Sequence, residues 1–249
     1  MTAPQLQHAP WIKHYPGTTE TGAAVIFPHA GGAAATYKPL ATAMSGKGCS
    51  TYVVQYPSRA DRLAHPAHTT VEQLATDLFE AGNWSDAGPL QLFGHCMGAL
   101  VAFEFARVAE QRGVPLRGLW VSAGQPPCDV VAAPELPTAP RQMLAEMVDL
   151  GGTDPRLLGD PDFVDLLLVA VGADYRALNR YTGGGRIATD IHALGGRSDH
   201  RIDQDMLNRW AAHTDGAFTL SMFDGGHFYV NDHLDTVAEL VTTELIDEP

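Results

Sequence analysis

The stretch Leu92-Phe93-Gly94-His95-Cys96-Met97-Gly98-Ala99-Leu100 joins an apolar run to a segment with helical character. Glycines stand two positions before and two positions after Cys96, the spacing of the Gly-x-Ser-x-Gly nucleophile elbow with Cys in place of Ser. A sharp strand-to-helix turn strains the backbone and brings neighbouring side chains into collision, so both flanking positions require glycine. The pattern predicts that Cys96 is a nucleophile. The alternative is a structural cysteine that lies buried between two incidental glycines.

The helix expected after Cys96 would also make its thiol more reactive. A helix N-terminus lowers the pKa of a thiol and therefore raises the fraction present as thiolate. We expect an oxyanion hole made of the backbone N–H of Met97 and that of Ala30, which lies in the turn after the first buried strand. A phosphate-binding loop is the rival interpretation of 29–32, but the glycine and lysine patterns of such loops are missing there.

The overall composition excludes several classes of protein. The chain has 249 residues, enough for one large α/β domain, and no apolar run approaches the ~20 residues of a membrane span. A formal charge of −13 disfavours nucleic acid and anionic membranes as partners. Three widely spaced cysteines argue against a disulfide framework, and Met1–Trp11 lacks the pattern of a secretory signal. We therefore expect a cytoplasmic protein, and we expect it to be a monomer.

Short apolar runs alternate with helical patterns along most of the chain. The expected strands cover 23–27, 51–56, 89–93, 119–122, 187–194 and 218–223. Helices are expected over 37–44, 97–112, 204–213 and 232–246, and a capping box at Thr69-x-x-Glu72 opens another. Strands that alternate with helices predict an α/β fold, with a mostly parallel central sheet and helices on both faces. We expect one domain over 1–249.

The alternation is interrupted between residues 125 and 185. Five prolines make a stiff connector, and two helical patterns follow at about 141–149 and 162–181. An insertion between core strands can form a helical lid over an active site. The alternative is a pair of helices that packs away from the site.

A thiol nucleophile needs a base and a group that orients the base. In the α/β-hydrolase order of nucleophile, acid and histidine, Cys96 is followed by Asp199 and His227, each just after an expected strand. Other histidines and acids compete for these roles: His29, His95, His65, His68, His233, Asp190, Asp203 and Asp205. We expect structural, surface or capping roles for them. No spacing of His and Cys resembles a zinc site, so we expect no metal.

The chain resembles the type II thioesterases of polyketide and nonribosomal peptide biosynthesis over nearly its whole length. The motifs that carry the resemblance are Phe27-Pro28-His29-Ala30-Gly31-Gly32, Gln55-Tyr56-Pro57-Ser58-Arg59-x-x-Arg62, Gly94-His95-Cys96-Met97-Gly98-Ala99, Ala173-Asp174-Tyr175, Trp210 with His213-Thr214, and Gly225-Gly226-His227-Phe228. The resemblance implies an α/β-hydrolase fold with a helical lid and a triad that includes Asp199 and His227. It also implies that the acyl substrate arrives on the phosphopantetheine arm of an acyl or peptidyl carrier protein, with no cofactor of the enzyme's own.

The chain departs from that family at two positions. Cys96 stands where the family normally has Ser, and Gly172 stands where it usually has Arg. A serine acyl-enzyme is an oxyester, whereas a cysteine acyl-enzyme is a thioester that exchanges readily with thiols and amines. The chemistry therefore leaves three functions open: a thioesterase, an acyltransferase that passes the group to another thiol or an amine, and a catalytically silent carrier-binding protein. An engineered Ser→Cys change is a further alternative for Cys96.

Carrier proteins tend to be acidic, so a negatively charged enzyme needs a local basic patch to bind one. We expect Arg59 and Arg62 to form such a docking patch near the entrance of the site. The alternative is that both arginines are solvated or form ion pairs that stabilise the fold.

Overall fold

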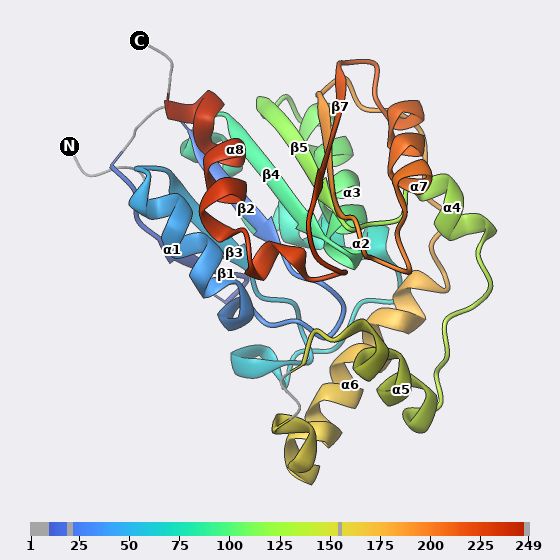
Figure 1. The fold of residues 1–249 in the computed structure, drawn as a ribbon. Coiled ribbons are helices and arrows are strands. Elements are labelled where there is room, and N and C mark those ends of the chain that lie inside the picture. Colours follow the sequence, from blue (N-terminus) through green and yellow to red (C-terminus); the bar gives the residue numbers. More distant parts are fainter. Residues whose placement is uncertain (1–9, 19–21, 154–155, 247–249) are drawn as a thin grey trace.

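A seven-stranded sheet in the order β1-β3-β2-β4-β5-β6-β7 forms the centre of the molecule (Figure 1). The computed structural model describes residues 10–18, 22–153 and 156–246, and the rest of the predicted domain lies outside this part. The strands are β1 (Ile12–Tyr15), β2 (Ala23–Phe27), β3 (Ser50–Val54), β4 (Leu90–His95), β5 (Leu116–Ser122), β6 (Ile191–Gly196) and β7 (Phe218–Phe223). Only β1 runs antiparallel to its neighbour. The predicted α/β fold with a mostly parallel sheet is confirmed.

Helices cover both faces of the sheet. The helices outside the insertion are α1 (Lys38–Gly46), α2 (Val71–Glu80), α3 (Met97–Gln111), α7 (Gln204–Asn208) and α8 (Leu234–Ile246). In Figure 1, α1 and α8 lie in front of the sheet and α2 and α3 lie behind it. Strand β2 shows why: Ala24 and Ile26 belong to the core under α1 and α8, and Val25 and Phe27 to the core under α2 and α3. Because both faces are covered, β2 is apolar along its whole length.

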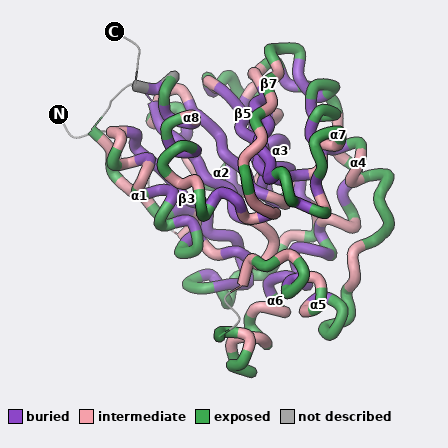
Figure 2. The backbone as a smooth tube through the Cα atoms, viewed as in Figure 1, coloured by how far each residue is buried: buried purple, intermediate pink, exposed green. Residues whose placement is uncertain are grey.

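The described part of the insertion between β5 and β6 contains the α-helices α4 (Pro127–Ala132), α5 (Pro140–Leu150) and α6 (Pro161–Leu178). Helices α5 and α6 lie below the sheet in Figure 1 and pack on each other through Met143, Met147, Val171 and Tyr175. Figure 2 shows that these two helices are mostly exposed or intermediate, whereas the sheet is mostly buried. The sequence did not indicate α4, which forms within the predicted proline-rich connector. The function of the insertion as a lid stays a prediction.

Two predicted boundaries were wrong for local reasons. Helix α2 is capped by Thr70, not Thr69, because the Thr70 hydroxyl accepts the N–H of Gln73 at 3.1 Å. Strand β6 begins at Ile191 and not at residue 187. Strand β1 was not predicted at all, since its four residues are partly polar.

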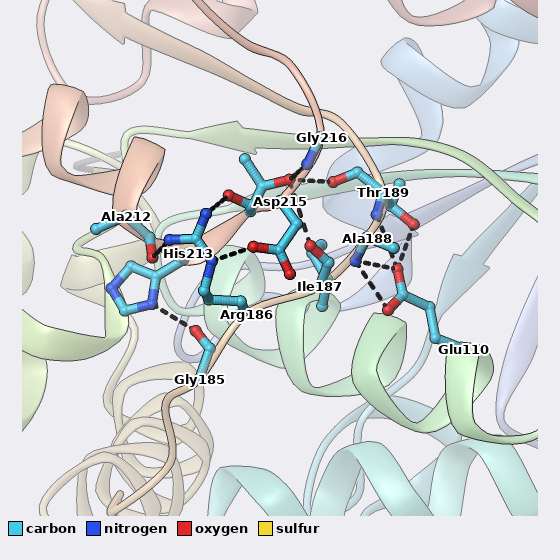
Figure 3. A network of polar contacts seen from close by, with 11 residues as sticks. Glu110, Gly185, Arg186, Ile187, Ala188, Thr189, Ala212, His213, Asp215 and Gly216 are labelled. Carbon is cyan, nitrogen blue, oxygen red and sulfur yellow. Dashed lines mark hydrogen bonds and ion pairs between the residues drawn. The ribbon is translucent and has the colours of Figure 1, made fainter.

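The late start of β6 follows from a polar network at its amino end (Figure 3). The Glu110 carboxylate accepts the backbone N–H groups of Ala188 and Thr189 at 2.9 Å, so these groups are not available to a sheet. The Arg186 guanidinium donates to the carbonyl of Ala212 at 2.7 Å and pairs with Asp215. This network fixes the segment that leads from α6 back into the sheet. Among the residues that the structure describes, no helix combines the length and apolar character of a membrane span.

Candidate active site

Cys96 lies on the turn between β4 and α3, with a positive φ of 57°. A Cβ on Gly94 would lie 2.2 Å from the carbonyl oxygen of Gly98, and a Cβ on Gly98 would lie 2.0 Å from that of Phe27. Both glycines are therefore required by contact with backbone atoms, which is the reason inferred from their spacing. The turn places the thiol at the first residue before α3, so the helix N-terminus faces it.

The structure brings Asp199 and His227 together beside this turn. Asp199 follows β6, His227 follows β7, and the ring Nδ1 of His227 donates to Asp199 Oδ2 at 2.8 Å. The other carboxylate oxygen accepts the backbone N–H groups of Arg201 and Ile202 at 2.9 and 3.2 Å. Burial raises the pKa of the Asp199 carboxyl, but these hydrogen bonds and the charge of His227 outweigh it, and the net pKa is lowered. Asp199 is therefore ionised and holds the imidazole in one orientation.

The thiol and the imidazole favour each other's charged forms. Burial raises the pKa of Cys96, but the charge and contact of His227 and the N–H groups of Met97 and Ala30 reverse this effect, and the net pKa is lowered. Burial lowers the pKa of His227, but the charges and contacts of Cys96 and Asp199 raise it overall. The His227 Nε2 atom makes no well-aligned hydrogen bond to the described residues in this resting state. The two shifts favour the thiolate form of Cys96 and the imidazolium form of His227, in contrast to the neutral pair that a serine would form.

The turn that presents Ala30 to Cys96 is tightly built. Its closing hydrogen bond runs from the N–H of Gly32 to the carbonyl of His29 at 2.9 Å, and Gly31 has a φ of +76°. A Cβ on Gly31 would also lie 2.5 Å from Val171 Cγ2 on α6. Glycine is therefore needed at 31 for its backbone angle and for the close approach of α6. The N–H groups of Met97 and Ala30 both help to lower the pKa of the Cys96 thiol, and all three residues line one cavity; the role of these two groups as oxyanion donors stays a prediction.

The rival histidines have other partners or are held neutral. Burial, with the charges of His227 and Arg59, lowers the pKa of His29 to about 3, and its Nδ1 lies 2.8 Å from Tyr37 Oη. Burial likewise lowers the pKa of His95 well below its usual value, and its Nδ1 contacts Ser122 Oγ at 2.9 Å. His68 pairs with Asp77, and His233 bonds the carbonyl of Asp224; His65 lies exposed in its loop.

The rival acids are also occupied away from His227. Asp203 caps α7 by accepting the N–H of Met206 at 2.7 Å, and Asp205 lies in the first turn of that helix. Asp190 accepts the N–H of Ala217 at 2.6 Å at the amino end of the sheet. In the part of the chain that the structure describes, no three His, Cys, Asp or Glu side chains gather as a metal site would require.

A cavity of about 490 Å³ opens directly onto Cys96 and His227. Much of its wall comes from the insertion: Val130 and Val131 of α4, Glu146, Met147 and Leu150 of α5, and Tyr175 and Leu178 of α6. Apolar side chains predominate in this list, and Arg201 and Glu146 add an ion pair of 2.7 Å at the wall. The cavity suits an acyl group, and the insertion covers it.

Arg59 and Arg62 do not form the basic surface patch expected from the sequence. Their side chains are 5% and 4% exposed. Arg59 binds Asp174 of α6 through two nitrogens, at 2.6 and 2.7 Å. Arg62 donates to the carbonyl of Gln55 at 2.9 Å and lies over the Trp11 ring at 3.6 Å. Both guanidinium groups are internal to the fold, so a carrier protein cannot dock on them, and the alternative of a structural role is the correct one.

Three residues near the site were not assigned a role from the sequence. Asp174 joins α6 to the turn at Ala30, Arg201 joins the loop of Asp199 to α5, and Tyr175 lines the cavity. A carboxylate within the otherwise apolar run of α6 was a usable signal for Asp174. The departure at Gly172 lies inside the contact of α6 with α5, where a Cβ would meet Met143 Cε at 3.4 Å.

Comparison with known proteins assigns the fold and the site to a family. Residues 24–245 match the model of the thioesterase domain. Phenyloxazoline synthase MbtB of Mycobacterium tuberculosis is 59% identical over 238 residues, which are 95% of this chain and 17% of MbtB. The chain thus spans about a sixth of the length of that relative. Thioesterase PikA5 of Streptomyces venezuelae is 35% identical over 241 residues, which are 95% of this chain and 85% of PikA5.

Two solved structures have nearly the same extent as this chain. The type II thioesterase BorB from the borrelidin biosynthetic cluster superposes with a TM-score of 0.79 at 36% identity, covering 94% of this chain and 97% of BorB. YbtT, the type II thioesterase from the yersiniabactin pathway, superposes with a TM-score of 0.77 at 27% identity, covering 94% and 98%. With these matches and a strand-to-helix turn at Cys96 that opens onto a mainly apolar cavity, the chain belongs to the thioesterase family, whose members hydrolyse thioesters.

Proposed function

We propose that this chain acts on acyl groups that a carrier protein of a polyketide or nonribosomal peptide pathway holds as phosphopantetheine thioesters. The observation that carries the proposal is the convergence of Cys96, His227 and the N–H groups of Met97 and Ala30 at one end of a cavity with mainly apolar walls. The names of BorB and YbtT, which are type II thioesterases, support the substrate class. The insertion at 125–185 acts as the lid of this cavity within a single domain. The enzyme needs no cofactor of its own, because the carrier brings the phosphopantetheine.

In the first half of the reaction the Cys96 thiolate attacks the carbonyl carbon of the substrate thioester. The oxygen becomes negative, and the N–H groups of Met97 and Ala30 stabilise that charge. The carbon–sulfur bond to phosphopantetheine then breaks, and the His227 imidazolium gives its proton to the departing thiolate. Asp199 keeps the imidazole oriented throughout. The products are the free carrier thiol and an acyl group bound as a thioester to Cys96.

In the second half an acceptor displaces Cys96. Neutral His227 takes a proton from the acceptor as it attacks, and the Cys96 thiolate leaves, which restores the ion pair. Water as the acceptor gives hydrolysis, the activity of the family. The cysteine specifically favours a second candidate, transfer of the acyl group to another carrier thiol or an amine, because a thioester intermediate is close in energy to the substrate thioester.

Intact-protein mass spectrometry separates these outcomes. The enzyme is mixed with an acylated carrier protein, with and without a second carrier that holds a free phosphopantetheine thiol. Loss of the acyl group to water at the same rate in both mixtures identifies a hydrolase. Discharge of acyl-Cys96 only when the second carrier is present identifies an acyltransferase.

The variant Cys96→Ala is the control for the covalent step, and it should carry no acyl group. If Cys96→Ala supports product formation as well as the unmodified enzyme, the covalent mechanism is wrong and a carrier-binding role gains support.

A further inference from the structure

The buried ion pair of Arg59 and Asp174 has no part in the steps described above, yet it contacts the turn that carries Ala30. Asp174 Oδ2 accepts the backbone N–H of Gly31 at 2.7 Å as well as the Arg59 guanidinium at 2.7 Å. Arg59 also donates to the carbonyl of Gly32 at 3.3 Å and to that of Pro57 at 3.0 Å. The two charged groups thus bind two peptides of the turn, the one that joins Ala30 to Gly31 and the one that joins Gly32 to Ala33.

The position of the Ala30 N–H depends on the peptides on either side of it. On the amino side, the N–H of His29 donates to Tyr37 Oη at 3.3 Å. On the carboxyl side, the peptide that joins Ala30 to Gly31 is held by Asp174. Because Gly31 has no side chain, this second peptide has more rotational freedom than one next to a larger residue. The hydrogen bond to Asp174 removes that freedom.

Stability alone is a poor explanation for the pair. Burying two charges costs several kcal/mol, and apolar residues of similar size often stabilise a core as well or better. Here, however, the pair has hydrogen-bond partners beyond its own two members. Two of them, Gly31 and Gly32, are backbone groups of the turn that carries Ala30, and the third is the carbonyl of Pro57. A fully satisfied polar network of this kind fixes one geometry.

The carboxylate also comes from a distant part of the chain. Asp174 lies on α6, whose next residue, Tyr175, lines the acyl cavity together with Leu178. Val171 of the same helix touches Gly31 closely. The helix that lines the acyl cavity is therefore also the helix that holds the turn at residues 29–32, the oxyanion turn.

We propose that Asp174 and Arg59 are positioning residues of the oxyanion hole, through which α6 holds the Ala30 N–H in place. The inference rests on the proposed function, because it takes Ala30 as an oxyanion donor. It predicts that acyl transfer to Cys96 needs the pair, whereas reactions of the thiolate that form no oxyanion do not.

The test uses the variants Asp174→Asn and Arg59→Lys, which keep the size or the charge of the original residue. With an acylated carrier or a simple acyl thioester, kcat should fall between about 10-fold and 100-fold with little change in KM, less than the ~10²–10³-fold loss of a deleted donor. Alkylation of Cys96 by iodoacetamide forms no oxyanion. Its rate at high pH in these variants should therefore stay within about twofold of the rate in the unmodified enzyme. The exposed Asp165→Asn on the same helix is the matched control and should leave both rates unchanged.

The double variant, Asp174→Asn with Arg59→Lys, should have a kcat only slightly lower than that of either single variant, since both substitutions act on one turn. Equal falls in turnover and in plateau alkylation would overturn the inference, because they indicate damage to the triad or the fold. Unchanged kcat in both variants would also overturn it. If Asp174→Asn does not fold, Arg59→Lys alone gives the comparison.

One part of the test does not depend on turnover and so separates the inference from the proposed function. The Ala30 N–H contacts the sulfur in the resting enzyme and helps to lower the pKa of the thiol. The pH profile of alkylation in Asp174→Asn should therefore shift to higher pH while its plateau stays the same. A profile identical to that of the unmodified enzyme contradicts the inference even if no acyl substrate is ever found.

Discussion

The insertion is attached to the catalytic machinery at two places that differ in their exposure to solvent. Helix α6 meets the oxyanion turn through Asp174 and Arg59, both about 5% exposed. Helix α5 meets the loop of Asp199 through Arg201, which pairs with Glu146 and Asp149 at 2.7 and 2.8 Å. The side chains of this second cluster are between 28% and 56% exposed, including His200, which also binds Asp149.

The difference indicates different tasks for the two attachments. An exposed pair is weakened by water and salt and can open and reform at little cost. A buried pair is hard to separate, because each charge would be left without a partner. Because α5 also packs on α6 through Met143 and Met147, only the exposed ion pairs of the α5 attachment open easily, whereas the Asp174–Arg59 pair stays closed.

The largest effect should come from the acid loop itself. Asp199→Asn removes the carboxylate that orients His227, so kcat should fall by about 10²-fold to 10⁴-fold. The imidazolium loses its partner, and the thiol pKa should therefore rise from its lowered value towards the ordinary value of 9.0. Steady-state turnover and the pH profile of Cys96 alkylation measure both changes. An unchanged alkylation profile would show that Asp199 does not act through His227.

Substitutions at the buried attachment should have the second largest effect on turnover and the largest effect on the free energy of unfolding. Asp174→Ala leaves the Arg59 charge buried and unpaired, which should lower the free energy of unfolding by about 3 to 5 kcal/mol. Urea denaturation gives this value, with Asp165→Ala on the exposed side of α6 as the control. A loss below about 1 kcal/mol would mean that water reaches the unpaired arginine and that the site is not as dry as its burial indicates.

The exposed attachment should have a small effect of another kind. The double variant Glu146→Gln with Asp149→Asn removes the partners of Arg201 and should change KM by only a few fold, with kcat and stability almost unchanged. The measurement is steady-state kinetics with an acyl thioester, compared with Asp162→Asn on the exposed start of α6. A fall in kcat as large as that of Asp174→Asn would remove the distinction between the two attachments.

Salt offers the mildest way to test the same distinction. Raising the salt concentration from about 0.05 to 0.5 M screens exposed charges far more than buried ones. In the unmodified enzyme, high salt should cause the same small change in KM as the double variant Glu146→Gln with Asp149→Asn. In that double variant, high salt should not change KM further. Kinetics of Asp174→Asn should respond to salt as the unmodified enzyme does.

The sequence was most informative where constraints are local. The glycine pattern around Cys96 was readable in one short stretch, although Gly98 is required by the carbonyl of Phe27 on β2, and the chain order of nucleophile, acid and histidine then left few choices for Asp199 and His227. The central strands of the sheet, such as β2, were recognisable because burial on both faces makes them apolar, whereas the partly polar β1 was missed.

Other features depend on partners far away in the sequence. Arg59 lies in a polar loop that looks exposed, and its partner Asp174 is 115 residues further along the chain. The start of β6 is set by Glu110, 78 residues before Ala188. No local pattern contains such pairings, which is why the docking role of Arg59 and the boundary of β6 were predicted wrongly.

Helix α6 both lines the acyl cavity and holds the turn at Ala30, and this limits how the substrate range of the enzyme can be changed. Substitutions at Tyr175 would reshape the acyl cavity, but they would also disturb the helix that holds the turn at Ala30 through Asp174, so selectivity and speed would change together. Val130, Val131 and Leu150 line the cavity from α4 and α5 but lie outside the cluster that packs on Ala30. Libraries that vary Val130, Val131 and Leu150 and leave α6 intact should therefore yield more variants that are both altered in selectivity and fully active.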